Sequence, residues 1–401
     1  MVMNMLLVLG FVWTLKTKQI NCRCKVSWNS KKITMRRMLE LVIVLAITLL
    51  NHPYAFSAFK TDTTGQQMPS RKTSSSVFPI LMYDSDIGFG FGGKGVIKDQ
   101  LKQGESFDLT IFGSTKGEQW YVFAFSIPDF EIRQGTAYPK ALDLKLEFDK
   151  FLKSNFFGFG NNSPDNDWQF PREMTKLELT LGRAFTERII GEIGLLFNHT
   201  SVYSYEGVNS ILTSEVPGAS EHLTTYFVAK LRRDTRDSQI HPHRGWKIGF
   251  NFDIASKSLG GDFSFQRYRL EVNKYQKLFT SAHVLAMRLW IQHVDGTAPY
   301  YEQSIIGGSW TTRGFKADRF IDRALTISSV EYRFPIYRKI GGVLFVDAGR
   351  VYPSIKKINL HGWKTDWGGG LRYYLANFVV RFDVGVSREG TRVFLNFGQV
   401  F

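Results

Sequence analysis

The chain has 401 residues, with 34 Phe, 16 Tyr and 36 Gly but only 12 Pro, a composition that favours strands and tight turns over helices. The mean hydropathy is -0.16, which excludes a bundle of transmembrane helices but not a barrel whose strands alternate between polar and apolar residues. The formal net charge is +15, yet no basic cluster is interleaved with stacking aromatic residues, so we expect no nucleic-acid partner.

The N-terminal region has the features of an export signal. Arg36 and Arg37 precede an apolar run at 41–50, and a small-x-small cleavage site follows at 55–57. The run is too short to cross a bilayer as a helix, which takes about 20 apolar residues. We therefore predict a leader over 1–57 that is removed on export.

The chain that remains after cleavage differs in charge and in cysteine content. The predicted signal peptide starts at Met35 or Met38, and a polar Ser/Thr-rich linker follows it over 58–76. Cleavage leaves 43 basic and 35 acidic side chains, a formal charge of +8. Both cysteines, Cys22 and Cys24, leave with the leader, so the exported chain forms no disulfide and needs a closed hydrogen-bonded architecture.

From residue 77 onward the sequence alternates between apolar and polar residues. The clearest run, 142–149, reads Leu-Asp-Leu-Lys-Leu-Glu-Phe-Asp. Such a period of two indicates β-strands with one apolar face. About sixteen runs of this kind lie near 77–83, 86–97, 105–114, 118–129, 141–151, 173–186, 188–204, 221–233, 244–256, 261–277, 281–294, 323–335, 340–351, 364–374, 377–387 and 391–401.

Two all-β architectures fit this pattern, a soluble sandwich and a transmembrane barrel. Sandwich strands are typically about five or six residues long, whereas most runs here are as long as a tilted strand that crosses a bilayer. The polar faces are densely charged, which suits a water-filled lumen, and the export signal directs the chain to an envelope. We predict a transmembrane antiparallel β-barrel of about sixteen strands over 77–401, with its apolar face toward lipid.

Alternation also predicts which side chains face the lumen. The apolar residues at 330, 332, 334 and 336 are assigned to the lipid face, so Glu331 points inward. The same argument turns Asp347 and Asp383 inward on neighbouring strands. The cations predicted on this wall are Arg333, Arg372 and Arg381.

The longest predicted connection, about 294–323, carries the glycine-bracketed cation Arg313. Glycines at 307, 308 and 314 permit tight turns and a close approach of the backbone to the wall. A guanidinium binds a carboxylate through two parallel hydrogen bonds. Spacing alone leaves two possibilities open: Arg313 docks on the acidic wall, or the loop is an ordinary exposed extracellular loop.

Several of these stretches resemble the motifs of BamA/TamA-type outer-membrane barrels, also known as the bacterial surface antigen family, which includes the two-partner secretion transporters. They follow the family order and spacing at 307–315 (Gly-Gly-Ser-Trp-Thr-Thr-Arg-Gly-Phe), 331–335 (Glu-Tyr-Arg-Phe-Pro), 341–349 (Gly-Gly-Val-Leu-Phe-Val-Asp-Ala-Gly), 368–372 (Gly-Gly-Gly-Leu-Arg) and 381–385 (Arg-Phe-Asp-Val-Gly). Further signatures at 157–161, 234–237 and 243–245 extend the resemblance over about residues 77–401.

The resemblance implies a barrel whose sixth extracellular loop folds into the lumen. In the family, the tip of that loop contacts acids on the barrel wall. Here the tip is Arg313, Gly314 and Phe315, its expected partners are Glu331 and Asp347, and Asp383, Arg372 and Arg381 lie nearby. The family also has a weak seam between its first and last strands, which insertase members open toward lipid. The resemblance thus implies a function in the insertion or transport of outer-membrane proteins or other clients.

One departure from the family pattern bears on that function. Family insertases and transporters carry periplasmic POTRA domains of mixed α/β structure before the barrel. Only residues 58–76 lie between the predicted cleavage site and the first predicted strand, which is too short for such a domain. We therefore expect either a separate periplasmic partner or the loss of the insertase role.

The last predicted strand indicates where the chain is sorted. Val393, Leu395, Phe397 and Phe401 share one face of this strand, and the sequence ends on Phe401. A terminal aromatic residue on an alternating strand resembles the sorting signal of bacterial outer-membrane barrels. We predict an integral protein of the outer membrane of a Gram-negative-type bacterium, with membrane lipid as a partner.

Two alternatives compete with an assembly barrel. The first is a passive porin, in which the charged wall acts as a selectivity ring. The second is an outer-membrane enzyme, for which His199 with Ser201, or Asp234 and Asp237 near His241 and His243, are the available combinations. Neither a GxSxG nor an HExxH signature is present. We expect no catalysis, no metal and no cofactor.

Overall fold

The computed structural model describes residues 73–165, 169–203, 212–279, 282–375 and 378–401. The predicted leader over 1–57 and the predicted linker as far as residue 72 lie outside the described residues. In the described part, none of the helices has the length and apolar character needed to cross a membrane.

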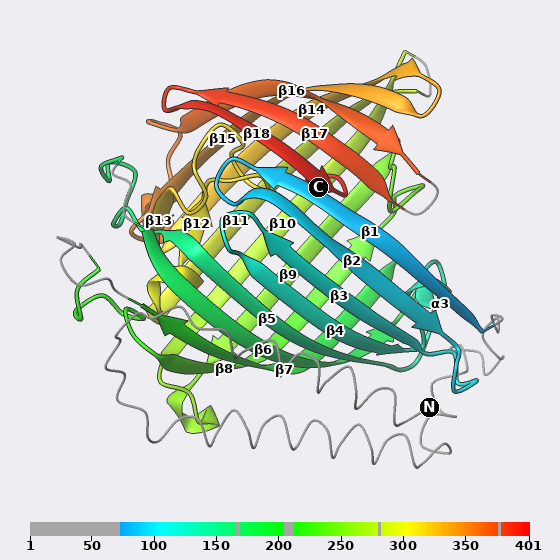
Figure 1. The fold of residues 1–401 in the computed structure, drawn as a ribbon, viewed down its shortest axis with the longest axis horizontal. Coiled ribbons are helices and arrows are strands. Elements are labelled where there is room, and N and C mark those ends of the chain that lie inside the picture. Colours follow the sequence, from blue (N-terminus) through cyan, green and yellow to red (C-terminus); the bar gives the residue numbers. More distant parts are fainter. Residues whose placement is uncertain (1–72, 166–168, 204–211, 280–281, 376–377) are drawn as a thin grey trace. The chain divides into compact units, whose positions relative to one another are not determined.

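Sixteen strands of the described residues close into an antiparallel barrel, which confirms the predicted all-β fold (Figure 1). Neighbours in sequence pair with each other, and β1 (Ser74–Asp84) closes the barrel against β18 (Gly390–Phe397). The strands between them are β2 (Gly88–Lys98), β3 (Ser106–Ser114), β4 (Gln119–Ile127), β5 (Ala141–Asn155), β6 (Gln169–Ala184), β7 (Ile189–Val202), β8 (His222–Asp234), β9 (Gly245–Ala255), β10 (Ser264–Leu278), β11 (His283–Thr297), β14 (Ala324–Tyr337), β15 (Ile340–Tyr352), β16 (Lys364–Tyr374) and β17 (Val379–Ser387).

The remaining elements are short and lie in the connections. The long connection between β11 and β14 contains a small two-stranded sheet, which the sequence pattern does not predict. These elements are α3 (Phe130–Arg133), η2 (Lys257–Leu259), η3 (Tyr300–Glu302), β12 (Ser304–Ile306), β13 (Phe320–Asp322) and η4 (Ile355–Lys357).

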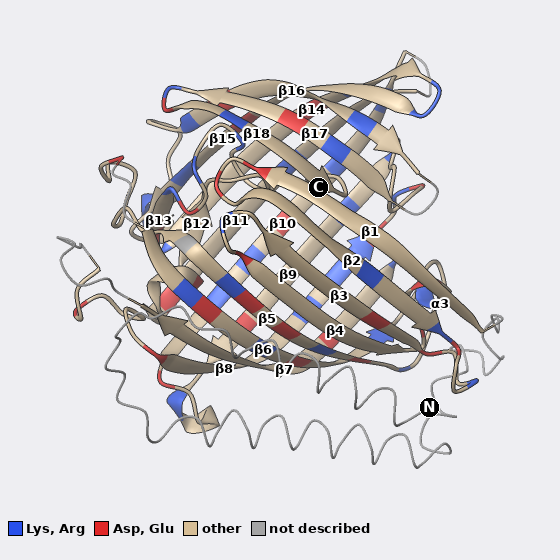
Figure 2. Cartoon of the chain, in the orientation of Figure 1, with Lys and Arg blue, Asp and Glu red and all other residues tan. Residues whose placement is uncertain are grey.

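The alternation of side chains explains the barrel. On β15, Leu344 and Val346 are 56% and 53% exposed on the outer face, whereas Phe345 and Asp347 are buried on the inner face. Charged residues lie along many of the strands (Figure 2). Apolar side chains outward and charged side chains inward are the arrangement of a barrel that spans a membrane.

The two ends of the barrel differ in what they carry. Because consecutive strands run in opposite directions, the start of β1 and the end of β18 lie at one end, here called the terminal end. The connection 298–323 lies at the other end, here called the loop end.

The closure between β1 and β18, here called the seam, is much weaker than the other strand pairings. Strand β1 pairs with β2 along all of its 11 residues. It pairs with β18 only at Tyr83↔Leu395 and Asp84↔Phe394, near the loop end. Residues 74–82 therefore have no ladder partner on the side of β18, and the two strands diverge toward the terminal end (Figure 1).

The C-terminal residues leave the barrel wall. Strand β18 ends at Phe397, and Gly398, with a φ of +84°, turns the chain into the lumen. Phe401 is buried there in a cluster that includes Tyr275 and Val284. The prediction that Phe401 continues the strand and shares the outer face of Phe397 is therefore wrong. Two cations facing its ring at 5.6 and 5.8 Å, Arg333 and Arg288, help to explain why the aromatic side chain is stable inside.

Candidate functional site

The connection 298–323 folds back into the barrel as a compact loop, here called the long loop. Its two legs pair as β12 and β13, with Ile306 opposite Phe320. Gly307 and Gly308 have φ values of +125° and +89°, which turn the chain after the first leg. The side chain of Phe315 is buried against Phe320, with ring centroids 5.4 Å apart.

An apolar cluster attaches the base of the long loop to the inner wall. Its loop members are packed against residues of β14 and β15, and every member is at most 1% exposed. Burial of this apolar area stabilises the loop in the lumen without any charged contact. The members are Ile306, Phe315, Phe320, Leu325, Ile327 and Val351.

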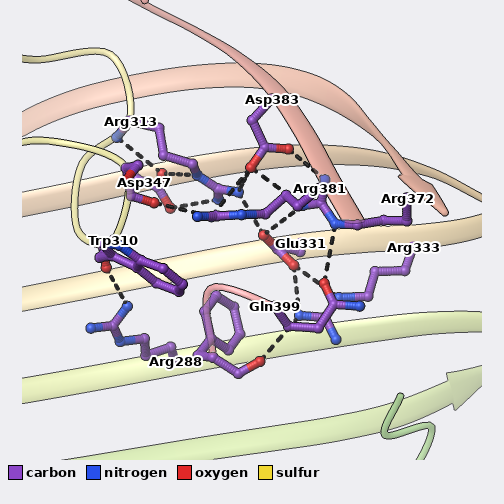
Figure 3. Close-up of polar contacts among 12 residues, drawn as sticks. Arg288, Trp310, Arg313, Glu331, Arg333, Asp347, Arg372, Arg381, Asp383 and Gln399 are labelled. Carbon is purple, nitrogen blue, oxygen red and sulfur yellow. Dashed lines mark hydrogen bonds and ion pairs between the residues drawn. The ribbon is translucent and has the colours of Figure 1, made fainter. Parts of the chain in front are cut away.

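Arg313 lies at the tip of the long loop and contacts three acids on three different strands. Its Nε and Nη2 donate to the two oxygens of Asp347, at 2.7 and 3.0 Å. Its Nη1 donates to Glu331 at 2.6 Å and to Asp383 at 3.3 Å. Figure 3 shows the guanidinium between these carboxylates.

The arginine and the acids are fully removed from solvent. Arg313, Glu331, Asp347 and Asp383 each have 0% exposed area. The guanidinium carbon of Arg313 also lies 3.4 Å from the ring centroid of Phe345, which adds a cation–π contact. Loss of one partner from such a buried pair leaves an uncompensated charge, which typically costs about 3–5 kcal/mol.

Three further arginines on the wall bind these acids. Arg333 donates to Glu331 at 2.8 Å, and Arg372 donates to Asp383 at 2.5 Å. Arg381 also donates to Asp383, at 3.4 Å. The wall also carries the buried side chains of Asp366 and Arg288, so four acids face four arginines and Arg313 adds a fifth cation, which Asp347 and Glu331 contact most closely.

Two glycines allow the loop tip to reach the wall. A Cβ on Gly314 would lie 2.5 Å from Cβ of Asp366, and a Cβ on Gly385 would lie 2.5 Å from the carbonyl oxygen of Arg313. Neither distance is possible for real side chains, so both positions require glycine. The hydroxyl of Ser387 donates to the carbonyl of Gly314 at 2.7 Å and holds the backbone in this position.

Backbone carbonyls just before Arg313 bind two cations of the wall, Arg381 and Arg288. Arg381 donates to the carbonyl of Ser309 at 3.0 Å and lies over the ring of Trp310 at 4.5 Å. Arg288 donates to the carbonyl of Trp310 at 2.8 Å. The tip is therefore held through its backbone as well as through Arg313 (Figure 3).

The structure brings most of the predicted site residues together. The network that surrounds Arg313 contains Gly314, Glu331, Asp347, Asp383, Arg372 and Arg381. Phe315 lies apart from the acids, in the apolar cluster. Phe397 packs edge-on against Phe378, with centroids 5.7 Å apart, and Phe401 lies in the lumen.

Other residues bind the long loop but are not predicted by any sequence pattern. Asp86, in the turn after β1, accepts from the backbone N–H of Ala317 at 2.8 Å. Asn155 donates to the carbonyl of Ala317 at 2.9 Å. These contacts join residues 231 and 162 positions apart, and a period-two pattern carries no information about such distant partners.

Of the histidines considered for catalysis or metal binding, His243 lies beside Asp237 as considered, with its Nδ1 3.7 Å from the carboxylate, and the others have different partners. His199 lies 3.0 Å from Glu221, and the ring of His241 stacks on Tyr374 with centroids 3.9 Å apart. Burial of this ring, followed by the influence of His243 and Arg333, lowers the pKa of His241 to about 4. No group of three or more His, Cys, Asp or Glu side chains in the described part of the chain is arranged to hold a metal ion.

Three solved structures resemble this fold. BamA from Haemophilus ducreyi lacking POTRA domains 1-3 matches with a TM-score of 0.62 and 13% identity, over 82% of this chain and 70% of that chain. CdiB from Acinetobacter baumannii matches at 0.57 and 10%, over 84% and 63%, so this chain spans less than two thirds of that protein's length. CdiB from Escherichia coli matches at 0.57 and 12%, over 82% and 68%.

These identities show a shared fold, whereas the family follows from the sequence match. No curated protein sequence matches the chain. The model of the Omp85 superfamily domain matches residues 100–399, which is most of the barrel together with the long loop and all members of the Arg313 network. The chain belongs to the Omp85 superfamily.

Proposed function

We propose that this chain is an integral outer-membrane barrel that helps client proteins enter or cross the membrane through the seam between β1 and β18. The observation that carries the proposal is that the paired part of the seam is short. Two residue pairs hold β1 to β18, while residues 74–82 of β1 have no ladder partner on that side. Among the described residues of the barrel, every other pair of neighbouring strands is held by more pairs.

A free strand edge has a strong tendency to pair when it faces lipid. Each backbone N–H or C=O group without a partner costs several kcal/mol in hydrocarbon, where no water is available. An unfolded client strand supplies those partners by adding to the edge, which is the general mode of β-augmentation. The unpaired part of β1 is therefore the proposed site of client binding.

The Arg313 network is proposed to position the long loop next to this site. Asp383 and Ser387, which bind Arg313 and the carbonyl of Gly314, both lie on β17, directly beside β18. The buried ion pairs hold the loop against the wall that ends at the seam. The network thus acts through geometry, and we propose no enzymatic step.

A passive porin is the second candidate, and one cavity favours it. The cavity has a volume of about 680 Å³. It is lined by residues of strands β3 to β8 and of the turns at the terminal end. Its wall includes the inward charged side chains of Asp143, Glu178, Lys230 and Arg232. A large steady conductance in planar bilayers that Arg313→Ala leaves unchanged would favour the porin over the assembly barrel.

The proposed location and partners follow from the family and the outer apolar face. We place the chain in the outer membrane of a Gram-negative-type bacterium, in contact with membrane lipid. Its clients are outer-membrane proteins or secreted proteins, delivered with or without a separate periplasmic partner. The solved relatives named above are similar to it in fold, and the proposal extends that likeness to the seam.

A covalent lock on the seam tests the proposal. Tyr83 and Leu395 are register partners across the seam, so the pair Tyr83→Cys and Leu395→Cys prevents the loop end of the seam from opening under oxidation, and a client strand on residues 74–82 cannot then separate β1 from β18. Val384→Cys with Val393→Cys, register partners within the fully paired β17–β18 ladder, is the matched control. The probe is an unfolded eight-stranded outer-membrane barrel added to liposomes that contain each variant.

The proposal expects oxidation to slow folding of the probe barrel for the seam pair, and reduction to restore it. The control pair is expected to give the same rate in both states. Equal rates for oxidised and reduced seam pairs, or no acceleration by the unmodified protein over empty liposomes, would contradict the proposed function.

A further inference from the structure

The long loop binds both sides of the seam at the loop end. Beyond its Arg313 network, the loop contacts the turn after β1 and the turn before β18. We call the five residues that make these contacts the seam clamp. They are Asp86, Ala317, Arg319, Glu389 and Arg392.

One carboxylate joins three segments of the chain. Asp86 lies in the turn after β1, and its Oδ2 accepts from the N–H of Ala317 in the long loop at 2.8 Å. Its Oδ1 accepts from Nη1 of Arg392 on β18 at 2.9 Å. The N–H of Asp86 donates to Asp84 at 2.8 Å, which fixes the direction of the turn.

The same part of the loop also holds the strand on the other side of the seam. Nε of Arg319 donates to Glu389, in the turn between β17 and β18, at 2.7 Å. The other guanidinium nitrogens donate to the hydroxyl and carbonyl oxygens of Ser163, at 2.9 and 3.0 Å. Arg319 is only 3% exposed, so its position is fixed by packing as well as by charge.

The clamp matters because so little else holds the seam. Besides the two ladder pairs, Ser85 exchanges hydrogen bonds with the backbone of Val393 through its hydroxyl, at 3.0 and 3.3 Å. These contacts lie within a few residues of Asp86, and further toward the terminal end the ring of Phe78 on β1 packs edge-on against Phe378, with centroids 6.2 Å apart. Hydrogen bonds to a charged group are stronger than those between neutral groups, so the Asp86 carboxylate contributes a large share of what remains.

We propose that Asp86 couples the long loop to the seam: a seated loop fixes the carboxylate on Arg392 and keeps the loop end of the seam closed. When the loop leaves the wall, the carboxylate loses the N–H of Ala317 and the pairs near Asp84 open more often. The purpose of this coupling rests on the proposed function. The coupling itself is a property of the chain alone and is measured without any client.

Hydrogen–deuterium exchange of the full chain in lipid nanodiscs measures the opening of the seam. Asp86→Ala removes the clamp carboxylate, and Arg392→Gln removes its partner on β18. The matched control is Asp262→Ala, because Asp262 also accepts a loop-end backbone N–H, that of Leu223 at 2.7 Å, but lies away from the seam. We expect roughly tenfold faster exchange at residues 393–395 for Asp86→Ala and little change for the control.

The coupling is tested by combining variants. Arg313→Gln weakens the seating of the loop and is expected to speed exchange at residues 393–395 when Asp86 is present. In the Asp86→Ala background the same substitution is expected to add little, since the path from loop to seam is already broken. Exchange in Asp86→Ala equal to that of the control, or equal effects of Arg313→Gln in both backgrounds, would overturn the proposal.

The exchange data and the cysteine lock separate the two proposals. Faster exchange in Asp86→Ala together with a normal folding rate of the probe barrel in the oxidised seam pair would support the clamp and contradict the proposed function. If oxidation of the seam pair blocks insertion but exchange at residues 393–395 is unchanged in Asp86→Ala, the proposed function is supported and the clamp is contradicted.

Discussion

Arg313 and Asp347 form a bidentate ion pair between the long loop and the barrel wall, with nitrogen–oxygen distances of 2.7 and 3.0 Å. Both side chains have 0% exposed area. In this setting the pair is not a general source of stability, because desolvation of the two charges offsets much of their attraction. Its effect is specificity, since a loop that lifts away leaves charged groups buried without partners.

Reversal of the loop charge is therefore expected to undock the loop. Arg313→Glu adds a carboxylate beside the three buried acids that Arg313 contacts and is expected to destabilise the docked state by roughly 3–5 kcal/mol. The change is measured as heat-modifiable migration of the folded barrel, which should be lost at a lower temperature. Arg323→Glu makes the same charge change at an exposed position of the same loop and should migrate like the wild type. Identical migration of Arg313→Glu and wild type would contradict the importance of the pair.

Steric exclusion at the loop tip gives a prediction that changes no charge. Gly314→Ala places a methyl group 2.5 Å from Cβ of Asp366, so the tip must move away from the wall. Overpacking of this kind typically costs about 1–3 kcal/mol. The same measurement should show lower heat resistance for Gly314→Ala. Gly249→Ala, where a Cβ meets nothing within 4 Å, is the control.

The period-two pattern predicted the strands and their faces well, because alternation directly records which side of a wall is apolar. The run predicted at 340–351 is β15, Ile340–Tyr352, and the acids Glu331 and Asp347 lie inward as their register requires. The family motif then indicated which loop residue meets these acids. The alternation pattern does not predict the contact between Asp86 and Ala317. Both residues lie in connections between strands, and alternation reports only which face of a strand a side chain occupies.

The C-terminus is a second place where the alternation pattern does not predict the structure. The run at 391–401 predicts a last strand that ends at Phe401, although Gln399 and Val400 interrupt its alternation. A single residue, Gly398 at a φ of +84°, directs the chain inward instead, and its N–H donates to the carbonyl of Val379 at 2.7 Å. Glycine is compatible with both the strand and the turn, so the sequence permits either outcome and the packing of Phe401 decides between them.

A β-branched residue at position 398 should shift that outcome. Gly398→Val disfavours the left-handed conformation by about 1–2 kcal/mol and is expected to release residues 399–401 from the lumen. The release is measured with Phe401→Trp, whose fluorescence should move toward longer wavelength when valine replaces Gly398. An unchanged spectrum would show that the packing of the aromatic side chain outweighs the backbone strain.

The turn at 235–244 is expected to respond to acid. Because the pKa of His241 is lowered from 6.5 to about 4, the folded state favours the neutral ring. Its contribution to stability is complete above about pH 6.5 and is lost as the pH falls from 6.5 through 4. Thermal unfolding in detergent should show a fall in melting temperature over this range. His241→Phe keeps a ring against Tyr374 without a titrating group and should flatten the dependence, whereas an equal fall in both proteins would exclude His241 as the cause.

Capture of a client strand on β1 tests the central claim most directly. Leu81 on the unpaired part of β1 and Leu231 on β8 are 50% and 51% exposed on the outer face, so a photo-crosslinking amino acid is equally accessible at either position, and only position 81 lies beside the seam. During folding of the probe barrel, we predict crosslinks from position 81 to a terminal strand of the client and none from position 231. Equal crosslinking from both positions, or none from position 81 while the probe folds, would contradict entry through the seam.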